Sequence, residues 1–139
     1  ADAITLPIEE IGSNAFRVIA RAKAAGAKIG VSLNPLTPID QLTHVLPLVD
    51  KVTVMMFDPG WAGQTLVGEA LKKVATIATV RAAAGQRFVI EVDGSCNERN
   101  FPLMLQLGAD QVVVGTSGLF QLDPDVGIAW QKMKAYMDG

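Results

Sequence analysis

The stretch that decides the fold is Phe-Val-Ile-Glu-Val-Asp-Gly-Ser-Cys-Asn at residues 88–97. Its first half favours β-structure, and such a run between turn signals is typical of a buried parallel strand. The run ends on the carboxylate of Asp93, and Gly94 then allows a tight turn beside a ligand. Because α/β sheets keep their chemistry at the carboxyl ends of the strands, Asp93 is the first catalytic candidate. An Asp-Gly pair after a strand is also an ordinary turn.

Strand-like and helix-like segments alternate along the whole chain. Strands are expected at residues 3–6, 28–33, 51–56, 88–92 and 110–114. Helices are expected from a cap at Ser13 or Asn14 to Gly26, from Thr37-Pro38 onwards, at residues 65–84, from Asn97 to Gly108, and from Asp123 or Pro124 onwards. In the second of these helices the residues expected to face inwards are Ile39, Leu42, Val45 and Leu46, and in the last the residues on one face are Val126, Ala129, Trp130, Met133 and Met137. This alternation predicts an α/β fold with parallel strands and right-handed crossovers. Periodicity leaves open whether the sheet is doubly wound or part of a closed barrel.

Composition narrows the class of protein. The 139 residues are 50% hydrophobic, which predicts a single domain spanning residues 1–139. A net charge of -2, with Lys and Arg scattered along the chain, argues against a nucleic-acid partner. No apolar run reaches membrane-spanning length, so no membrane partner is expected. The single Cys96 excludes an internal disulfide and suits a reducing compartment, so a cytoplasmic location is expected.

Three glycine-containing loops follow successive predicted strands. They are Gly60-Trp61-Ala62-Gly63, Gly94-Ser95 and Gly115-Thr116-Ser117-Gly118. In a parallel barrel all three lie on the carboxyl-terminal face, where the loops after the last strands often bind phosphate. Free backbone N–H groups and the hydroxyls of Thr116 and Ser117 are suited to an anion. Together the loops predict a phosphate site.

Two further residues near Asp93 are interpreted as structural. Cys96 is expected at a helix start, where a thiolate is favoured, but no partner histidine is in view. Glu91 is expected to point away from the side of the strand that carries Asp93, so that a carboxylate pair is not implied.

Four segments, taken in order and spacing, resemble the later part of the ribulose-phosphate 3-epimerase family. They are Val54-Met55, Asp58-Pro59-Gly60 with Gly63-Gln64, Ile90-Glu91-Val92-Asp93-Gly94 and Val114-Gly115-Thr116-Ser117. The continuation Ser95-Cys96-Asn97 and the ending Gly-Thr-Ser-Gly-Leu-Phe look most like the D-allulose-6-phosphate 3-epimerase branch. The likeness covers essentially the whole chain.

This resemblance implies a (β/α)₈ barrel of which the chain holds strands four to eight. It implies a divalent metal ion (Zn, Mn, Co, Fe or Mg) with Asp93 as one ligand, the other ligands coming from strands two and three. It also implies that Asp93 is one of two acid/base groups, and that Met55 lines the pocket. The backbone groups of Gly60 to Gly63, including Trp61 and Ala62, of Gly94-Ser95 and of Gly115 to Ser117 are implied to bind phosphate.

The expected function is therefore 3-epimerisation of a phosphorylated ketose through a cis-enediolate. The pair of substrates is either D-allulose and D-fructose 6-phosphate or D-ribulose and D-xylulose 5-phosphate. The alternatives are another phosphate-binding barrel, such as a lyase, and a sugar-phosphate-binding fragment without turnover. A homo-oligomer is expected. Five strands of a barrel are also expected to leave two open edges and an apolar sheet face.

Overall fold

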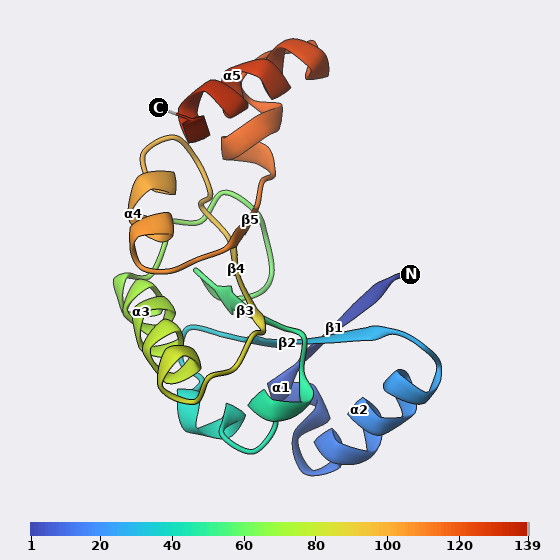
Figure 1. Cartoon of the computed structure of the whole chain (residues 1–139). Coiled ribbons are helices and arrows are strands. Elements are labelled where there is room, and N and C mark those ends of the chain that lie inside the picture. Colours follow the sequence, from blue (N-terminus) through green and yellow to red (C-terminus); the bar gives the residue numbers. More distant parts are fainter. Residues whose placement is uncertain (139) are drawn as a thin grey trace.

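The computed structural model describes residues 1–138, and its five strands form one parallel sheet. The strands are β1 (Ala3–Pro7), β2 (Lys28–Leu33), β3 (Lys51–Met55), β4 (Val89–Asp93) and β5 (Gln111–Val113). The α-helices are α1 (Ile8–Ile11), α2 (Ala15–Ala24), α3 (Gly68–Ala83), α4 (Phe101–Gln106) and α5 (Val126–Asp138). Figure 1 shows α2, α3 and α4 along the outer side of a curved sheet.

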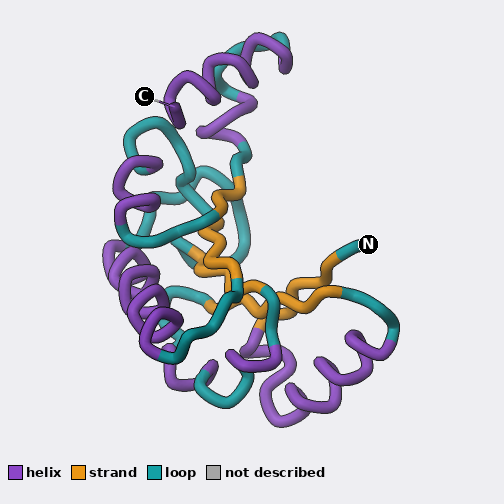
Figure 2. The backbone as a smooth tube through the Cα atoms, in the orientation of Figure 1, coloured by secondary structure: helices purple, strands orange, loops and turns teal. Residues whose placement is uncertain are grey.

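The order of the strands in the sheet is β1-β2-β3-β4-β5, the same as their order along the chain. A doubly wound sheet reverses direction at a switch point, and no reversal occurs here. When each parallel strand is added on the same side through a right-handed crossover, the connections all lie on one face. The tube in Figure 2 follows this arrangement, with the strands as one strip and the helices beside it. The fold is α/β, and the sheet is that of a partial (β/α)₈ barrel.

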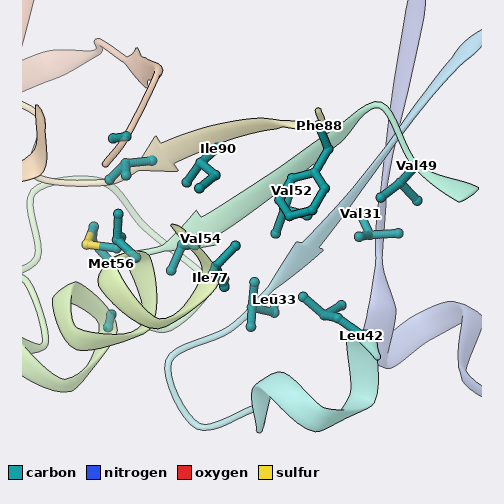
Figure 3. Close-up of a cluster of buried hydrophobic side chains, with 14 of the residues drawn as sticks. Val31, Leu33, Leu42, Val49, Val52, Val54, Met56, Ile77, Phe88 and Ile90 are labelled. Atoms are coloured by element: carbon teal, nitrogen blue, oxygen red, sulfur yellow. The ribbon is translucent and has the colours of Figure 1, made fainter. Parts of the chain in front are cut away.

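The core lies between the sheet and the helices. Alternate residues of the strands point towards the helices and are completely buried, namely Ile29, Val31 and Leu33 of β2, Val52 and Val54 of β3, and Ile90 and Val92 of β4. Ile77 of α3 and Leu42 pack against this row (Figure 3). In this layer the apolar residues at every second position of the strands pack against the apolar residues at every third or fourth position of the helices. No helix among residues 1–138 combines the length and the apolar character needed to cross a bilayer.

The opposite face of the sheet carries polar side chains, which corrects the expectation of an apolar face. Thr53 of β3 lies opposite Glu91 of β4. Glu91 accepts hydrogen bonds from the Thr53 hydroxyl at 2.8 Å and from the Lys51 ammonium at 2.7 Å. The expectation for Glu91 was also wrong, because residues two apart on a strand share a face. Glu91 and Asp93 are therefore on the same side of β4.

The segment after Thr37-Pro38 is not the helix that the apolar spacing predicted. It forms two 3₁₀ turns, Ile39–Leu42 and Leu46–Leu48. Pro47 lies inside the segment, where it removes a backbone donor and clashes with the preceding turn of an α-helix. The expected inner face is largely kept, since Leu42, Val45 and Leu46 are buried.

The helices α2 and α5 differ from expectation in their details. Asn14 flanks α2 but makes no capping bond, and its side-chain oxygen instead accepts a hydrogen bond from Arg17 at 2.8 Å. In α5, Ala129 and Met133 are buried, whereas Val126 and Trp130 are 61% and 48% exposed. Only part of the predicted apolar face of α5 is therefore covered by the described residues.

Opposite charges hold the loop after β2 from two sides. The Glu9 carboxylate of α1 accepts hydrogen bonds from the Asn34 N–H at 2.8 Å and from the Thr37 hydroxyl. The Lys73 ammonium of α3 donates to the carbonyls of Asn34, at 2.9 Å, and of Thr37. Partial burial raises the pKa of Glu9, but these donors outweigh it and hold the pKa below its ordinary value.

Replacing Glu9 by Gln tests this arrangement. Because the folded-state pKa of Glu9 is lowered, its contribution to stability is present above its unfolded-state pKa and is lost as the pH falls through the folded-state pKa. Glu9→Gln should lower the free energy of unfolding at pH 7 by about 0.5 kcal/mol, as is usual for exposed charged pairs. Urea titrations at pH 7 and pH 3 measure the difference, which should vanish at pH 3. Glu10→Gln is the matched control, and an equal loss there would contradict the assignment.

Candidate functional site

A cavity of about 450 Å³ opens at the carboxyl ends of β3, β4 and β5. The side chain of Asp93 ends β4 and lies in its wall. The other lining residues are Val113, which ends β5, and residues of the three loops that follow these strands, namely Phe57, Ala62, Gly63, Gln64, Thr65, Leu66, Gly94, Ser95, Cys96, Asn97, Arg99, Asn100, Gly115, Thr116 and Ser117. Segments more than 50 residues apart in sequence thus form one wall.

The first loop, residues 57–66, is closed at its base and folded on itself. The Val67 N–H donates to the Met56 carbonyl at 2.7 Å. Inside the loop, the Gln64 amide donates to the carbonyls of Asp58 at 2.8 Å and Trp61 at 3.0 Å. The loop is therefore held in shape by the side chain of Gln64, and Trp61 is 70% exposed.

The second loop follows Asp93 and is tied to the first. The Ser95 hydroxyl donates to the Gln64 carbonyl at 2.8 Å. Ser95 itself has φ of 51°, the left-handed region that L-residues rarely adopt. Gly94 has φ of 110°, and a Cβ there would lie 2.5 Å from the Phe57 ring. Glycine is therefore required at position 94, both for the turn and for the contact with the first loop.

The third loop is pressed against the second. It forms a π-helical turn over Thr116–Phe120, in which the N–H groups of Leu119 and Phe120 donate to the Gly115 carbonyl at 2.9 and 3.1 Å. A Cβ at Gly118 would lie 1.9 Å from the Cys96 carbonyl oxygen. This approach is possible only for glycine, so position 118 sets the distance between the second and third loops.

Asp93 has the electrostatic character of an acid/base group. Its carboxylate accepts no hydrogen bond from the residues that the structure describes. Burial raises the pKa of Asp93, the negative charge of Glu91 raises it further, and Lys51 opposes them. A carboxyl group with a raised pKa is a better match to proton transfer near neutral pH than an ordinary Asp.

The described residues do not by themselves form a metal site. Within residues 1–138 there is no group of three His, Cys, Asp or Glu side chains placed to hold a metal ion. Asp93 has a free carboxylate that fits one coordination position, whereas Glu91 is already bonded to Lys51 and Thr53. A metal bound at Asp93 would therefore need ligands from outside these residues.

The structure brings most of the predicted site residues to one cavity, but not all of them. Asp93, Ala62, Gly63, Gly94, Ser95, Gly115, Thr116 and Ser117 line it. Gly60 and Trp61 lie in the first loop outside the lining, and Met55 is paired with Asp93 in the sheet without lining the cavity.

Sequence reasoning missed other lining residues, among them Phe57, Gln64, Arg99 and Asn100. Phe57 and Gln64 each lie within three residues of a glycine or a strand end, and this signal could have identified them. Arg99 and Asn100 carried no such signal.

Cys96 is buried in the loop before α4 and does not lie at the start of a helix, which corrects the expected environment of its thiol. Its Sγ donates to the carbonyls of Val92 at 3.5 Å and Gly94 at 3.6 Å. Burial is the main cause that raises the pKa of Cys96 to about 11. A thiolate is therefore disfavoured, and Cys96 packs as a small apolar residue.

Comparisons with known proteins agree on one family. The model of the "Ribulose-phosphate 3 epimerase family" matches residues 1–120. The ribulose-phosphate 3-epimerase of Treponema pallidum is 40% identical over 118 residues, which are 84% of this chain and 53% of that protein. The ribulose-phosphate 3-epimerase of Methanocaldococcus jannaschii is 38% identical over 133 residues, which are 96% of this chain and 56% of that protein. The chain spans about half the length of these curated relatives.

A solved structure shares the fold. The crystal structure of 3-hexulose-6-phosphate synthase superposes with a TM-score of 0.66 at 16% sequence identity. The match covers 99% of this chain and 62% of the other. At this identity the likeness concerns the fold alone.

Replacing Gly118 by Ala tests the contact between the second and third loops. The added methyl would overlap the Cys96 carbonyl, so the loops must separate, and overpacking of this kind costs about 1–3 kcal/mol. Urea denaturation measures the loss. Gly68→Ala is the control, because a Cβ at Gly68 has no heavy atom within 4 Å and Ala favours the helix. Equal stabilities of the two variants would show that the contact is not limiting.

Proposed function

Because this chain belongs to the ribulose-phosphate 3-epimerase family, we propose that it forms the Asp93-bearing and phosphate-binding part of a ketose-phosphate 3-epimerase. The substrate is a phosphorylated pentulose or hexulose. The continuation Ser95-Cys96-Asn97 favours a hexulose 6-phosphate, as in the D-allulose-6-phosphate branch.

The observation that carries this proposal is the position of Asp93. Its half-buried carboxylate has a raised pKa and faces a cavity built from three loops. The second loop approaches the first at Gly94 and the third at Gly118, where a side chain would not fit. A small polar ligand bound between the loops would therefore lie next to a single acid/base group.

The reaction needs Asp93 to move a proton at a carbon next to a ketone. A base on one face of that carbon takes the proton, and an acid on the other face returns it, so that the configuration inverts. Asp93 is one of these two groups, and its pKa, raised by burial, suits both roles. The second group comes from outside residues 1–138, since Glu91 is held by Lys51 and Thr53.

The phosphate group is anchored at the loop Gly115–Ser117. Backbone N–H groups and the hydroxyls of Thr116 and Ser117 are donors in the lining of the cavity, which Gly63 and Ser95 also line. Anchoring the phosphate orients the reacting carbon towards Asp93. A divalent metal, when bound with Asp93 as a ligand, supplies a Lewis acid for the negative charge that develops on the substrate.

Asp93→Asn in the intact protein that carries this chain tests the catalytic role. The amide keeps the shape but can neither take the proton nor serve as an anionic ligand, so kcat/KM should fall by about three orders of magnitude or more. A coupled epimerase assay with ribulose 5-phosphate and allulose 6-phosphate measures it. Asp58→Asn, in the neighbouring loop, is the control. Turnover at the parent rate by Asp93→Asn would refute the role.

The chain by itself should not catalyse epimerisation. Residues 1–138 provide one acid/base carboxylate where the reaction needs two groups, and the open edges of β1 and β5 favour pairing with another copy. We expect no turnover from residues 1–139 with added Mn²⁺ or Zn²⁺, and recovery when a segment with the first three strands of a relative is supplied. Size-exclusion chromatography with the coupled assay measures both. Turnover by the mass-verified chain alone would contradict the assignment, and phosphate binding without turnover in the completed protein would favour a binding module.

A further inference from the structure

One cationic side chain lines the cavity and has no role in the chemistry proposed above. Among the described residues that line it, Arg99 is the only Lys, Arg or His, and Asp93 is the only carboxylate. The guanidinium of Arg99 makes no hydrogen bond or ion pair within residues 1–138. Some other cations of the described residues are paired with carboxylates, such as Arg81 with Asp110 and Lys132 with Asp123. Arg99 is thus an exposed cation left available at the cavity.

The backbone around Arg99 is fixed by side chains of its own loop. The Arg99 N–H donates to the Asn97 side-chain oxygen at 3.2 Å. The Asn100 amide donates to the Ser95 carbonyl at 2.8 Å, and the Asn100 N–H donates to the Asn97 carbonyl at 2.9 Å. Hydrogen bonds before and after Arg99 hold its backbone, so the place where its side chain begins is fixed. The end of the side chain is exposed.

The same loop touches the one that carries the proposed phosphate donors. The approach of Gly118 to the Cys96 carbonyl joins them three residues before Arg99. A second cavity of about 200 Å³, lined by Asn97, Glu98, Arg99, Ser117 and Leu122, shares Asn97, Arg99 and Ser117 with the first. Arg99 therefore lies at the boundary of the two cavities beside Ser117. Glu98 contacts only the smaller one.

These observations point to a ligand with more than one negative charge. A phosphate monoester near neutral pH carries between one and two charges and has three acceptor oxygens. Neutral N–H and hydroxyl donors at Gly115–Ser117 can bind the oxygens but do not balance the charge. A planar guanidinium with a fork of donors matches both the charge and the geometry.

We propose that Arg99 binds the phosphate group of the substrate together with the loop Gly115–Ser117, and so determines specificity for phosphorylated over unphosphorylated ketoses. This inference rests on the proposed function. Arg99 acts through ground-state binding and does not contact the reacting carbon.

Binding of inorganic phosphate to the intact protein tests the proposal. Calorimetric titrations at low ionic strength should give a Kd for Arg99→Gln about 3- to 10-fold weaker than for the parent, the range for a charge-assisted bond at an exposed site. Arg99→Lys should recover part of the loss, because it keeps the charge but not the fork. The phosphate affinity of the parent should also fall more steeply with added NaCl than that of Arg99→Gln.

Arg87→Gln is the matched control, since Arg87 is also exposed but lines a different cavity, at the amino ends of the strands. Its Kd should equal that of the parent. An unchanged Kd in Arg99→Gln, or an equal loss in Arg87→Gln, would overturn the role of Arg99 and leave the proposed function standing. Absence of phosphate binding by the parent would overturn both.

Discussion

Every feature of the site depends on the rule that each new strand pairs in parallel with the one before it. Parallel pairing in chain order forces each connection back over the same face, so all strands point in one direction and all carboxyl ends meet at one rim. The three loops that form the cavity are separated in sequence by a helix and a strand each, yet they are neighbours because β3, β4 and β5 are neighbours.

Within that rim, the loops are held together by contacts that use the backbone more than side chains. Val67 closes the first loop on Met56, Ser95 joins the second loop to Gln64, and Gly118 lets the third loop reach Cys96. Such contacts hold the backbone of the three loops in place around the cavity. The few side chains that do enter, Asp93 and Arg99 above all, therefore dominate its charge.

The alternation of strands and helices was predictable because each strand has a row of apolar residues that must be buried. The bounds of β2 match the predicted residues 28–33, and the parallel direction of the strands was predicted from the alternation, whereas their order in the sheet was left open. Local chemistry was less predictable. Pro47 prevented a helix although the apolar face was right, and Cys96 was placed at a helix start although its loop buries it. The orientation of Glu91 could have been predicted from strand geometry, but the prediction was wrong.

The site was predictable where the chemistry is local to a strand end and unpredictable where it depends on how loops fold. Asp93 follows a strand directly, so its position required no knowledge of the loops. Where Trp61 and Arg99 lie relative to the cavity depends on the hydrogen bonds that Gln64 and Asn97 make in their loops. No periodic pattern in the sequence reveals these bonds. The close approach at Gly118 has the same origin, because a glycine in a sequence does not indicate what it will touch.

The left-handed backbone of Ser95 has a consequence for substitution at this position. An L-residue at φ of 51° costs about 1 kcal/mol, and the hydrogen bond from its hydroxyl to Gln64 returns a net amount of similar size. Serine and glycine are therefore nearly equivalent here in overall stability. They differ in mobility, since glycine relaxes the turn but releases the first loop from the second. Exchange between the two residues would be almost neutral for folding while changing how freely the entrance of the cavity opens.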